Sequence, residues 1–297
     1  MGHGIAYLFA AAGHQVGLYE SNAQSRASLA RRWRQILELF DDDPALLGRI
    51  SVYDQLAPAI AEAAFVFEAA PERLPLKQQI FAELERIVAA DAVLASNSSA
   101  IPSTQIARRL KCRERVVGTH FWNPPHLVPL VEVVQNEWTA KAVVESTMAL
   151  LRQVGKTPVH VRRDIPGFVG NRLQHALKRE AIAILAEGVC DAETIDTVVK
   201  QGLGARMAVL GPMEQIRPGW VGSNPRHRQR TLSSSGPNSR ASSLFASEGR
   251  QRSSGNGDRR RLSKMEPAGG RRGPRRTVAI SCSEGKTEGV AYRRCRG

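Results

Sequence analysis

The sequence has few cysteines, no long apolar run and, toward its C-terminal end, few acidic residues. Its four cysteines, Cys112, Cys190, Cys282 and Cys295, are scattered, and their spacing matches neither a metal site nor a disulfide framework. No apolar run approaches the roughly 18–20 residues of a membrane span. The N-terminus lacks a charged-then-apolar signal pattern. We therefore expect the ordered part to be a soluble, cytoplasmic globule without a membrane partner.

The shortage of acidic residues is confined to the last part of the chain. Residues 1–215 carry 23 basic and 23 acidic residues, whereas residues 216–297 carry 19 basic and 5 acidic ones, so the whole net charge of +14 lies in the second segment. That segment holds 17 Arg but only 2 Lys, with 13 Ser and 12 Gly, and it has lost nearly all apolar periodicity. Such a composition buries too little surface to offset its ordering entropy, which predicts a low-complexity, disordered tail.

Two explanations of residues 216–297 stay open. The segment is either a natural basic tail that contacts nucleic acid, or the translation of a GC-rich gene in the wrong reading frame. The change of character follows Gln215 in mid-motif, and no aromatic interleaving or RGG repeat supports RNA binding. We favour the change of frame and do not expect nucleic acid as a partner.

Strand and helix patterns alternate over the first 163 residues. Apolar strand-type runs occur at 15–20, 64–70, 92–96, 116–120, 131–134 and 158–161. Helical patterns separate them, at 1–14, 23–40, 75–89 and 140–154. Near-continuous apolar strands that alternate with helices predict an α/β fold with a parallel sheet.

From residue 164 onward the periodicity is helical only. A long amphipathic helix is expected to end at about Glu187, and Asp191 is expected to cap another over 192–201. We therefore divide the chain into an α/β domain (1–163), a partial all-α domain (164–215) and the tail (216–297).

A dinucleotide site is indicated by Glu20, which ends the first strand pattern after a glycine-bearing helix. In dinucleotide-binding folds an acid at this place binds the adenosine ribose hydroxyls and disfavours the 2′-phosphate of NADP. A G-x-G-x-x-G loop should come just before that helix, but only its last glycine is found, as Gly2. We therefore expect a Rossmann-like sheet that lacks its first strand. Gly2 could equally be an ordinary close-packing glycine, so this half motif leaves the cofactor open.

Residues suited to proton transfer lie farther along the chain. His120 and Asn123 follow a buried strand pattern. Glu132 lies in an apolar strand, where a buried carboxylate needs a partner. A base, an acid to orient it, and the hydroxyls of Ser98 and Ser99 fit proton-coupled chemistry at a carbon–oxygen bond. Taken alone, the two serines could instead cap a helix.

Together, these segments resemble the 3-hydroxyacyl-CoA dehydrogenase family, which has an NAD-binding Rossmann domain and a helical C-terminal domain. The similarity covers residues 1–215 and is carried, in the family's order, by Met1-Gly2-His3-Gly4-Ile5-Ala6, Ala12-Gly13-His14, Ser96-Asn97-Ser98-Ser99, His120-Phe121-Trp122-Asn123-Pro124-Pro125, Leu130-Val131-Glu132-Val133, Asp164-Ile165-Pro166-Gly167-Phe168-Val169, Asn171-Arg172 and Gly211-Pro212-Met213-Glu214. The resemblance implies NAD as cofactor, a small hydroxyacyl substrate oxidised from a 3-hydroxyl to a 3-oxo group, and a homodimer. Against the family pattern, the chain looks shortened at its N-terminus and, in the explanation favoured above, frameshifted after Gln215.

The resemblance assigns roles to individual residues as well. His120 matches the catalytic base and Glu132 the acid paired with it. Ser99 matches a serine near the substrate hydroxyl and the nicotinamide, and Asn171 matches an asparagine that reaches the substrate oxygen. The positions that contact the cofactor correspond to Gly2, Glu20, Glu72, Lys77, Ser99 and Asn123. No metal is expected.

One departure from the family concerns the substrate. Members that act on acyl-CoA usually have a lysine where this sequence has Pro129. The pattern around Pro129 resembles the branch that oxidises free hydroxy acids, so attachment of the substrate to CoA stays open. A reading of another class also stays open, in which the chain is an inactive remnant of such an enzyme.

Overall fold

A computed structural model of the chain describes residues 1–216 and 277–282. The described residues divide into two compact units, one formed by residues 1–177 with 277–282 and the other by residues 178–216. The predicted domain boundary at residue 164 lies within the first of these units. The tail prediction for 217–276 and 283–297 lies outside the described residues.

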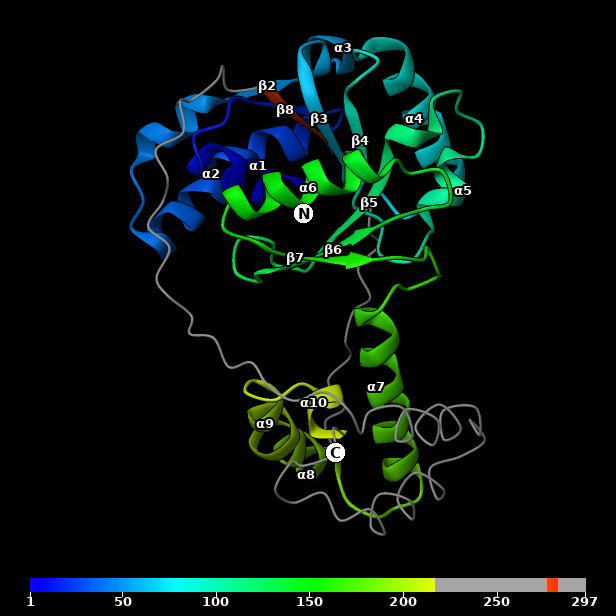
Figure 1. The fold of residues 1–297 in the computed structure, drawn as a ribbon. Coiled ribbons are helices and arrows are strands. Elements are labelled where there is room, and N and C mark those ends of the chain that lie inside the picture. The colour runs from blue at the N-terminus through cyan, green and yellow to red at the C-terminus, as the bar shows by residue number, and fades with distance from the viewer. Residues whose placement is uncertain (217–276, 283–297) are drawn as a thin grey trace, which may run out of the picture. The chain divides into compact units, whose positions relative to one another are not determined.

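The first unit is built on one sheet, to which the described residues contribute eight strands in the order β2-β1-β8-β3-β4-β5-β6-β7 (Figure 1). Neighbouring strands are parallel except β5 and β6, which are antiparallel. The strands are β1 (Val16–Glu20), β2 (Ile50–Tyr53), β3 (Ala63–Glu68), β4 (Val93–Ser96), β5 (Val116–Phe121), β6 (Leu130–Val134), β7 (Thr157–Val161) and β8 (Thr277–Cys282).

A strand from the far end of the sequence occupies the place for which no strand was expected. β8 lies between β1 and β3 and is parallel to both. Residues 277–282, which belong to the predicted tail, therefore pair with two central strands. This pairing was not predicted, because six residues within an arginine-rich, low-complexity segment carry no signal for a specific partner strand.

Helices cover both faces of the sheet. The helices of the first unit are α1 (Gly2–Ala11), α2 (Ala23–Phe40), α3 (Leu56–Ile60), α4 (Leu74–Ile87), α5 (Ser103–Ala107) and α6 (Lys141–Gln153), with short 3₁₀ helices at Pro44–Arg49 and Arg113–Arg115. Side chains alternate along a strand, so Phe67 and Ala95 join the core beneath α1, α2 and α6. Val66 and Leu94 point the other way and join the core beneath α3, α4 and α5. The result is a three-layer arrangement, and it confirms the α/β fold with a mainly parallel sheet that the strand and helix patterns predicted.

Local signals explain where several helices begin and end. Asn22 caps α2 by accepting a hydrogen bond from the Ser25 N–H at 2.8 Å, and α2 ends at Asp41, whose φ is 54°. Asp43 caps the following 3₁₀ helix by accepting from the Ala45 N–H at 2.8 Å. These carboxylates and amides satisfy N–H groups that have no partner inside the helix.

The second unit is helical, as predicted. α7 (Gly170–Ala186) begins in the first unit and ends in the second, which also holds α8 (Ala192–Val198), α9 (Ala205–Met207), α10 (Pro212–Ile216) and a π-helical segment at Val199–Gly204. Asp191 caps α8 through the Thr194 N–H at 2.8 Å, as expected. No helix within the described residues is both long enough and apolar enough to cross a membrane.

Candidate active site

The centre of the site is a histidine–carboxylate pair set by strand register. In the antiparallel pair of β5 and β6, His120 lies directly opposite Glu132. Nδ1 of His120 is 2.8 Å from Oε2 of Glu132. His120 is 5% exposed and Glu132 is 1% exposed. A hydrogen bond in such a buried setting is electrostatically stronger than in water, so the fold brings together the base and the acid that the sequence predicted.

The other oxygen of Glu132 is held by helix α7. Its Oε1 accepts hydrogen bonds from the backbone N–H groups of Val169 and Gly170, each at 3.0 Å. The first N–H groups of a helix lack helical partners and favour negative charge nearby. Burial raises the pKa of the Glu132 carboxyl, but the hydrogen bonds from His120, Gly170 and Val169 and the attraction of His120 lower it overall. Glu132 is therefore held as a carboxylate from both sides.

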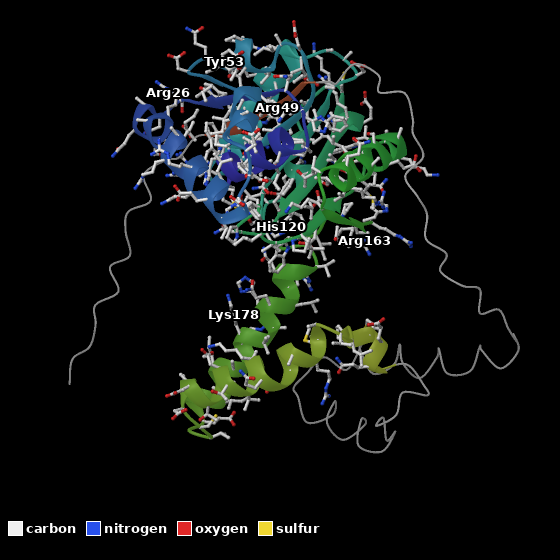
Figure 2. The ribbon with its side chains drawn as sticks, turned by 90° about the vertical axis from the view of Figure 1, so that its left-hand side faces the viewer. Arg26, Arg49, Tyr53, His120, Arg163 and Lys178 are labelled. Carbon is white, nitrogen blue, oxygen red and sulfur yellow. The ribbon has the colours of Figure 1, made fainter. Side chains whose placement is uncertain are left out.

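Aromatic rings enclose the imidazole of His120. The ring centroids of Trp122 and Phe168 lie 5.9 Å and 5.6 Å from that of His120. Trp122 packs closely over Gly170, where a Cβ atom would stand 2.2 Å from Cζ2 of the indole. Figure 2 shows His120, on an interior strand of the sheet, close to the start of α7. Nδ1 contacts Glu132, and no described residue forms a hydrogen bond to Nε2, so Nε2 is the ring nitrogen without a protein partner.

Ser99 and Asn171 meet next to this pair. Nδ2 of Asn171 donates a hydrogen bond to the backbone oxygen of Ser99 at 2.8 Å. Ser99 is exposed and follows β4, while Asn171 is half-buried and lies in the first turn of α7. Because Gly170 contacts Glu132, the same helix end reaches both the acid and the serine segment. The four residues predicted to be catalytic thus gather around the start of α7.

Glu72 fixes the backbone of the serine segment. Its Oε1 accepts a hydrogen bond from the Ser98 hydroxyl. The same oxygen accepts from the N–H groups of Ser99 (3.2 Å), Ala100 (2.9 Å) and Ile101 (3.0 Å). Burial raises the pKa of Glu72, but the accepted hydrogen bonds and the attraction of a nearby ammonium group lower it overall. One carboxylate oxygen therefore organises the turn that presents Ser99.

The ammonium group beside Glu72 belongs to Lys77, which is fully buried. Its Nζ lies 2.7 Å from Oε1 of Glu68, 3.1 Å from the Ala70 oxygen and 3.7 Å from Oε2 of Glu72. Glu68 is also fully buried, and its Oε2 accepts from the Ser96 hydroxyl at 2.8 Å. Lys77 is thus an internal counter-ion for two carboxylates. Its geometry shows no surface from which it would touch a cofactor directly.

The remaining predicted cofactor residues lie at ends of elements. Gly2 begins α1, and Met1, the residue before it, makes no side-chain hydrogen bond that caps the helix. Glu20 ends β1, is 3% exposed, and accepts from the Asn22 N–H at 2.9 Å. A helix N-terminus without a side-chain cap suits a pyrophosphate, and an acid at a strand end suits a ribose. These residues fit the adenosine and pyrophosphate part of NAD. Asn123 is exposed in the loop after β5.

Sequence reasoning missed several residues that support the site. Asn97 accepts a hydrogen bond from the Phe121 N–H at 2.9 Å and so ties the serine segment to β5. Asp164 accepts from the Ser103 hydroxyl at 3.0 Å and from the N–H (2.7 Å) and hydroxyl (3.0 Å) of Thr104. Asn97 and Asp164 belong to the motifs that carry the family resemblance, but no local pattern indicated their partners. For Glu68, the one sequence signal of a supporting role was its position at the end of a buried strand.

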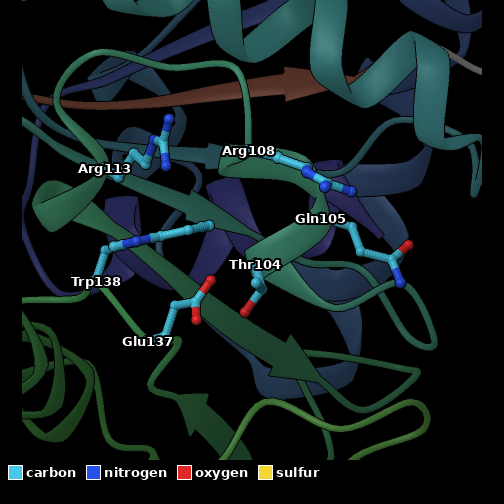
Figure 3. Close-up of a pocket in the computed structure, with 6 residues that line it drawn as sticks. All are labelled: Thr104, Gln105, Arg108, Arg113, Glu137 and Trp138. Atoms are coloured by element: carbon cyan, nitrogen blue, oxygen red, sulfur yellow. The ribbon is translucent and has the colours of Figure 1, made fainter.

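A separate pocket of about 480 Å³ lies beside α5 (Figure 3). Its lining consists of Thr104, Gln105, Arg108, Arg113, Glu137 and Trp138, and includes none of the predicted site residues. The Arg113 guanidinium stacks on the Trp138 ring, 4.6 Å from its centroid. Because Glu137 adds a carboxylate to a lining with two guanidinium groups, the pocket has no uniform charge that would select a ligand.

Comparison with known proteins adds independent evidence. Residues 1–165 match the NAD binding domain of 3-hydroxyacyl-CoA dehydrogenase, and residues 167–257 match its C-terminal domain, so the similarity continues past Gln215. A 5-formyl-3-hydroxy-2-methylpyridine 4-carboxylate 5-dehydrogenase from Mesorhizobium japonicum is 36% identical over 219 residues, which cover 72% of this chain and 71% of that protein. An L-carnitine dehydrogenase from Streptomyces griseus is 37% identical, covering 72% of this chain and 65% of that protein.

Solved structures agree with this result. The crystal structure of 3-hydroxybutyryl-CoA dehydrogenase from Escherichia coli K12 superposes with a TM-score of 0.64 at 36% identity, covering 69% of this chain and 44% of that chain. Its fold is therefore shared by most of the described residues. The site and the fold define an NAD-dependent oxidoreductase of the hydroxyacyl or hydroxy-acid type. The chain belongs to the 3-hydroxyacyl-CoA dehydrogenase family.

Proposed function

We propose that this chain oxidises a 3-hydroxyl group to a 3-oxo group with His120 as the general base. The single observation that carries the proposal is the buried His120–Glu132 pair, in which the 2.8 Å contact uses Nδ1 and leaves Nε2 for the substrate. A neutral imidazole titrates near physiological pH and is therefore suited to accept the hydroxyl proton. NAD, when bound, supplies the acceptor for the hydride.

Glu132 has two tasks in this proposal. As a carboxylate on Nδ1 it holds the proton on that nitrogen, which keeps Nε2 unprotonated and directed at the substrate. It also stabilises the imidazolium that forms when Nε2 accepts a proton. The N–H groups of Val169 and Gly170 support both tasks, because they keep the Glu132 side chain in one orientation.

Ser99 and Asn171 are proposed to bind the substrate oxygen. The hydroxyl of Ser99 and the amide of Asn171 can both donate hydrogen bonds to an oxygen that gains negative charge as its proton leaves. The 2.8 Å contact between Asn171 Nδ2 and the Ser99 backbone oxygen supports this role, because it brings the two side chains to one place.

We propose that NAD is held by Gly2, Glu20, Glu72, Ser99 and Asn123, with Lys77 acting behind Glu72. Gly2 and Glu20 provide the helix start and the strand-end acid. Glu72 holds the turn of Ser99 in place. Because Lys77 is fully buried, its contribution is to fix Glu72 and Glu68 through charge.

The substrate is proposed to be a 3-hydroxyacyl-CoA thioester or a free hydroxy acid. The family name favours the thioester. Pro129 in the sequence and the substrates named for two relatives, L-carnitine and a pyridine carboxylate, favour a free acid. Steady-state assays that follow NADH formation with 3-hydroxybutyryl-CoA, free 3-hydroxybutyrate and L-carnitine separate these possibilities.

The test of the base is His120→Ala assayed with the best of these substrates. We expect turnover to fall by about 10³-fold or more, because a positioned general base contributes roughly 10²–10⁴-fold. NADH affinity, measured by fluorescence titration, should stay within about threefold of the unsubstituted protein, since losing one distant hydrogen bond costs under about 1 kcal/mol. Equal turnover in the variant would remove His120 from the mechanism.

We also propose that the chain forms a homodimer in the cytoplasm and does not bind nucleic acid. Exposed apolar side chains in the second unit support self-association: Ile182 is 65% exposed, Val189 is 67% exposed and Val198 is 62% exposed. Light scattering after gel filtration tests the dimer, and a monomer at micromolar concentration would contradict it. Fractionation of source cells tests the location, and a salt-dependent DNA shift would contradict the last statement.

A further inference from the structure

Lys156 is a buried lysine that belongs neither to the proton-transfer pair nor to the residues proposed to hold NAD. It precedes β7, and only 8% of it is exposed. Its Nζ donates hydrogen bonds to the backbone oxygens of Pro125 at 2.6 Å and Val128 at 3.0 Å. Within residues 1–216, none of its contacts is with a carboxylate. Burying an ammonium group without a counter-ion is costly, and burial lowers the pKa of Lys156 accordingly. The two hydrogen bonds to carbonyl oxygens offset part of this cost, and they fix the backbone that carries those oxygens.

Both contacts of Lys156 go to one loop, residues 122–129, which joins β5 to β6 and contains Asn123. The loop forms a turn of its own, in which the N–H groups of Leu127 and Val128 donate to the Pro124 oxygen at 3.1 Å and 3.0 Å. Its last residue is fixed separately, because the Thr157 N–H donates to the Pro129 oxygen at 2.9 Å. Lys156 therefore controls the middle of the loop and not its ends.

The loop also rests on the start of α1. A Cβ atom on Gly4 would stand 2.7 Å from Cγ of Pro125, so the helix backbone and the proline ring are in close contact. Only a glycine allows this approach without a shift. The loop is thus held by Lys156 and packed against the first turn of α1, with Pro125 taking part in both contacts.

Positive charge also gathers at this place. Burial, the Lys156 ammonium group and the chain's N-terminal amine all lower the pKa of the His126 imidazole. The ammonium group of Lys156 is therefore close enough to His126 to disfavour a proton on it. The N-terminal end of a helix adds positive potential of its own. In folds of this kind, the pyrophosphate of a dinucleotide binds at that helix end.

The proton-transfer pair does not depend on these contacts. His120 and Glu132 are held opposite each other by the β5–β6 ladder, and Glu132 is held again by α7. A change at Lys156 should therefore act on the loop and on α1 before it acts on the pair.

We propose that Lys156 is a positioning residue, which sets the 122–129 loop against the N-terminal end of α1 and thereby controls the affinity for NAD. The proposal rests on the proposed function, since it concerns the cofactor of that reaction. It separates two tasks within one site: Lys156 governs the binding of the cofactor, and His120 with Glu132 governs the proton.

The test compares Lys156→Met with Lys141→Met. Lys141 lies on α6 with a side chain that is 88% exposed, so its replacement makes the same chemical change without affecting the loop. The dissociation constant of NADH, measured by fluorescence titration, should rise about tenfold in Lys156→Met, the effect of one lost charge-assisted hydrogen bond. With saturating NAD, kcat should stay within about twofold, because the His120–Glu132 pair is retained. Lys141→Met should match the unsubstituted protein in both respects. Unchanged NADH affinity in Lys156→Met overturns the proposal.

Two further measurements separate positioning from general destabilisation. Hydrogen exchange of the Leu127 and Val128 amides, followed without any cofactor, should be faster in Lys156→Met and unchanged in β5. In Lys156→Ala, added ethylammonium should fill the vacated site and restore NADH affinity at least in part, whereas a merely unstable fold would not respond. Faster exchange throughout the sheet, with no rescue, would mean that Lys156 only stabilises the fold.

Two outcomes require an additional variant or comparison. If Lys156→Met does not fold, Lys156→Arg keeps the charge but changes the geometry at the two carbonyl groups. That variant is expected to fold and to bind NADH several-fold more weakly, and full affinity in it would contradict the proposal. If the unsubstituted protein binds no NADH, the proposed function fails, and control of NAD affinity by Lys156 fails with it. Unchanged NADH binding in Lys156→Met, with normal binding by the unsubstituted protein, removes the role of Lys156 alone.

Discussion

Replacing Glu132 by glutamine changes a carboxylate that accepts hydrogen bonds from two directions, from His120 and from the start of α7. Oε2 of Glu132 faces Nδ1 of His120, while Oε1 accepts the N–H groups of Val169 and Gly170. A glutamine has a single oxygen and one NH₂ group of the same size. The NH₂ group of the glutamine must therefore face an N–H donor, either that of His120 or those of Val169 and Gly170. Either His120 or the start of α7 loses its acceptor.

The size of the effect follows from this geometry. If the NH₂ group faces His120, the proton is driven to Nε2, which then cannot accept one from the substrate. In a comparable histidine–carboxylate pair, the change from acid to amide lowers kcat by about 10⁴-fold. If the NH₂ group faces α7 instead, the imidazolium loses a charge-assisted hydrogen bond of about 1.5–3 kcal/mol, or about 10–100-fold in rate. We therefore expect a loss of about 10–10⁴-fold in kcat, depending on which way the amide faces.

The stability of the same variant depends on pH. The pKa of Glu132 is lower in the folded protein than its ordinary value, which is about 4.3 in an unfolded chain. The carboxylate therefore stabilises the fold fully above that unfolded value, and its contribution is lost as the pH falls through the folded pKa. Leaving a buried hydrogen-bonding group without its partner costs roughly 1–3 kcal/mol. Glu132→Gln should be less stable than the unsubstituted protein at pH 7, and the difference should shrink in acid.

The assay combines NADH formation at saturating cofactor with urea unfolding at pH 7 and pH 4. Glu137→Gln is the matched control, because Glu137 is an exposed carboxylate just after β6. We expect the control to keep its kcat and its unfolding midpoint. A Glu132→Gln enzyme with kcat within fivefold of the unsubstituted protein would refute the assigned pairing. A stability difference that grows in acid would refute the pKa argument.

Two other predictions follow from close contacts. Gly170→Ala places a Cβ atom 2.2 Å from the Trp122 ring, so the free energy of unfolding, measured with urea, should fall by about 1–3 kcal/mol. Gly48→Ala is the control, because the space around its Cβ atom is open. Equal stability of the two variants would show that Trp122 can move away at no cost. Glu72→Gln removes the charge that holds the Ser98–Ile101 turn, and because this side chain is 38% exposed we expect a loss of only about 1 kcal/mol at pH 7. The pKa of Glu72 is lowered in the fold, so the loss should shrink as the pH falls below the ordinary glutamate value of about 4.3, and a loss that grows in acid would contradict the account.

Local signals in the sequence predicted the main elements well. The helix over 23–40 was predicted from its polar and apolar pattern, and α2 has those bounds. β2, by contrast, was not predicted. It is a four-residue edge strand whose residues are half-buried or exposed, so it lacks the apolar run that marks a buried strand. α5 was missed for a similar reason: it spans five residues, and Asp164, sixty residues away, hydrogen-bonds to its first turn.

The chemistry of the site was easier to predict than its support. His120 and Glu132 were paired through the family motif, and the structure joins them. Lys77 was placed among the cofactor residues, and the structure buries it completely between Glu68 and Glu72. On a helical pattern a lysine next to a core face looks the same whether its end is solvated or turned inward. The position of Glu68 decides whether the end of Lys77 turns inward, and that position is fixed only when β3 lies beside α4.

The reversal of one strand connects the fold to the chemistry. Had β6 been parallel to β5, a crossover of a dozen or more residues would have been needed between them, whereas the loop of residues 122–129 makes the turn directly. An antiparallel neighbour places residues of two strands directly opposite one another, and this register sets Glu132 against His120. The same short loop then has to be fixed in its middle, where the ladder does not reach, and Lys156 contacts it there. The reversed strand thus accounts for the proton-transfer pair and for the need of a buried lysine beside it.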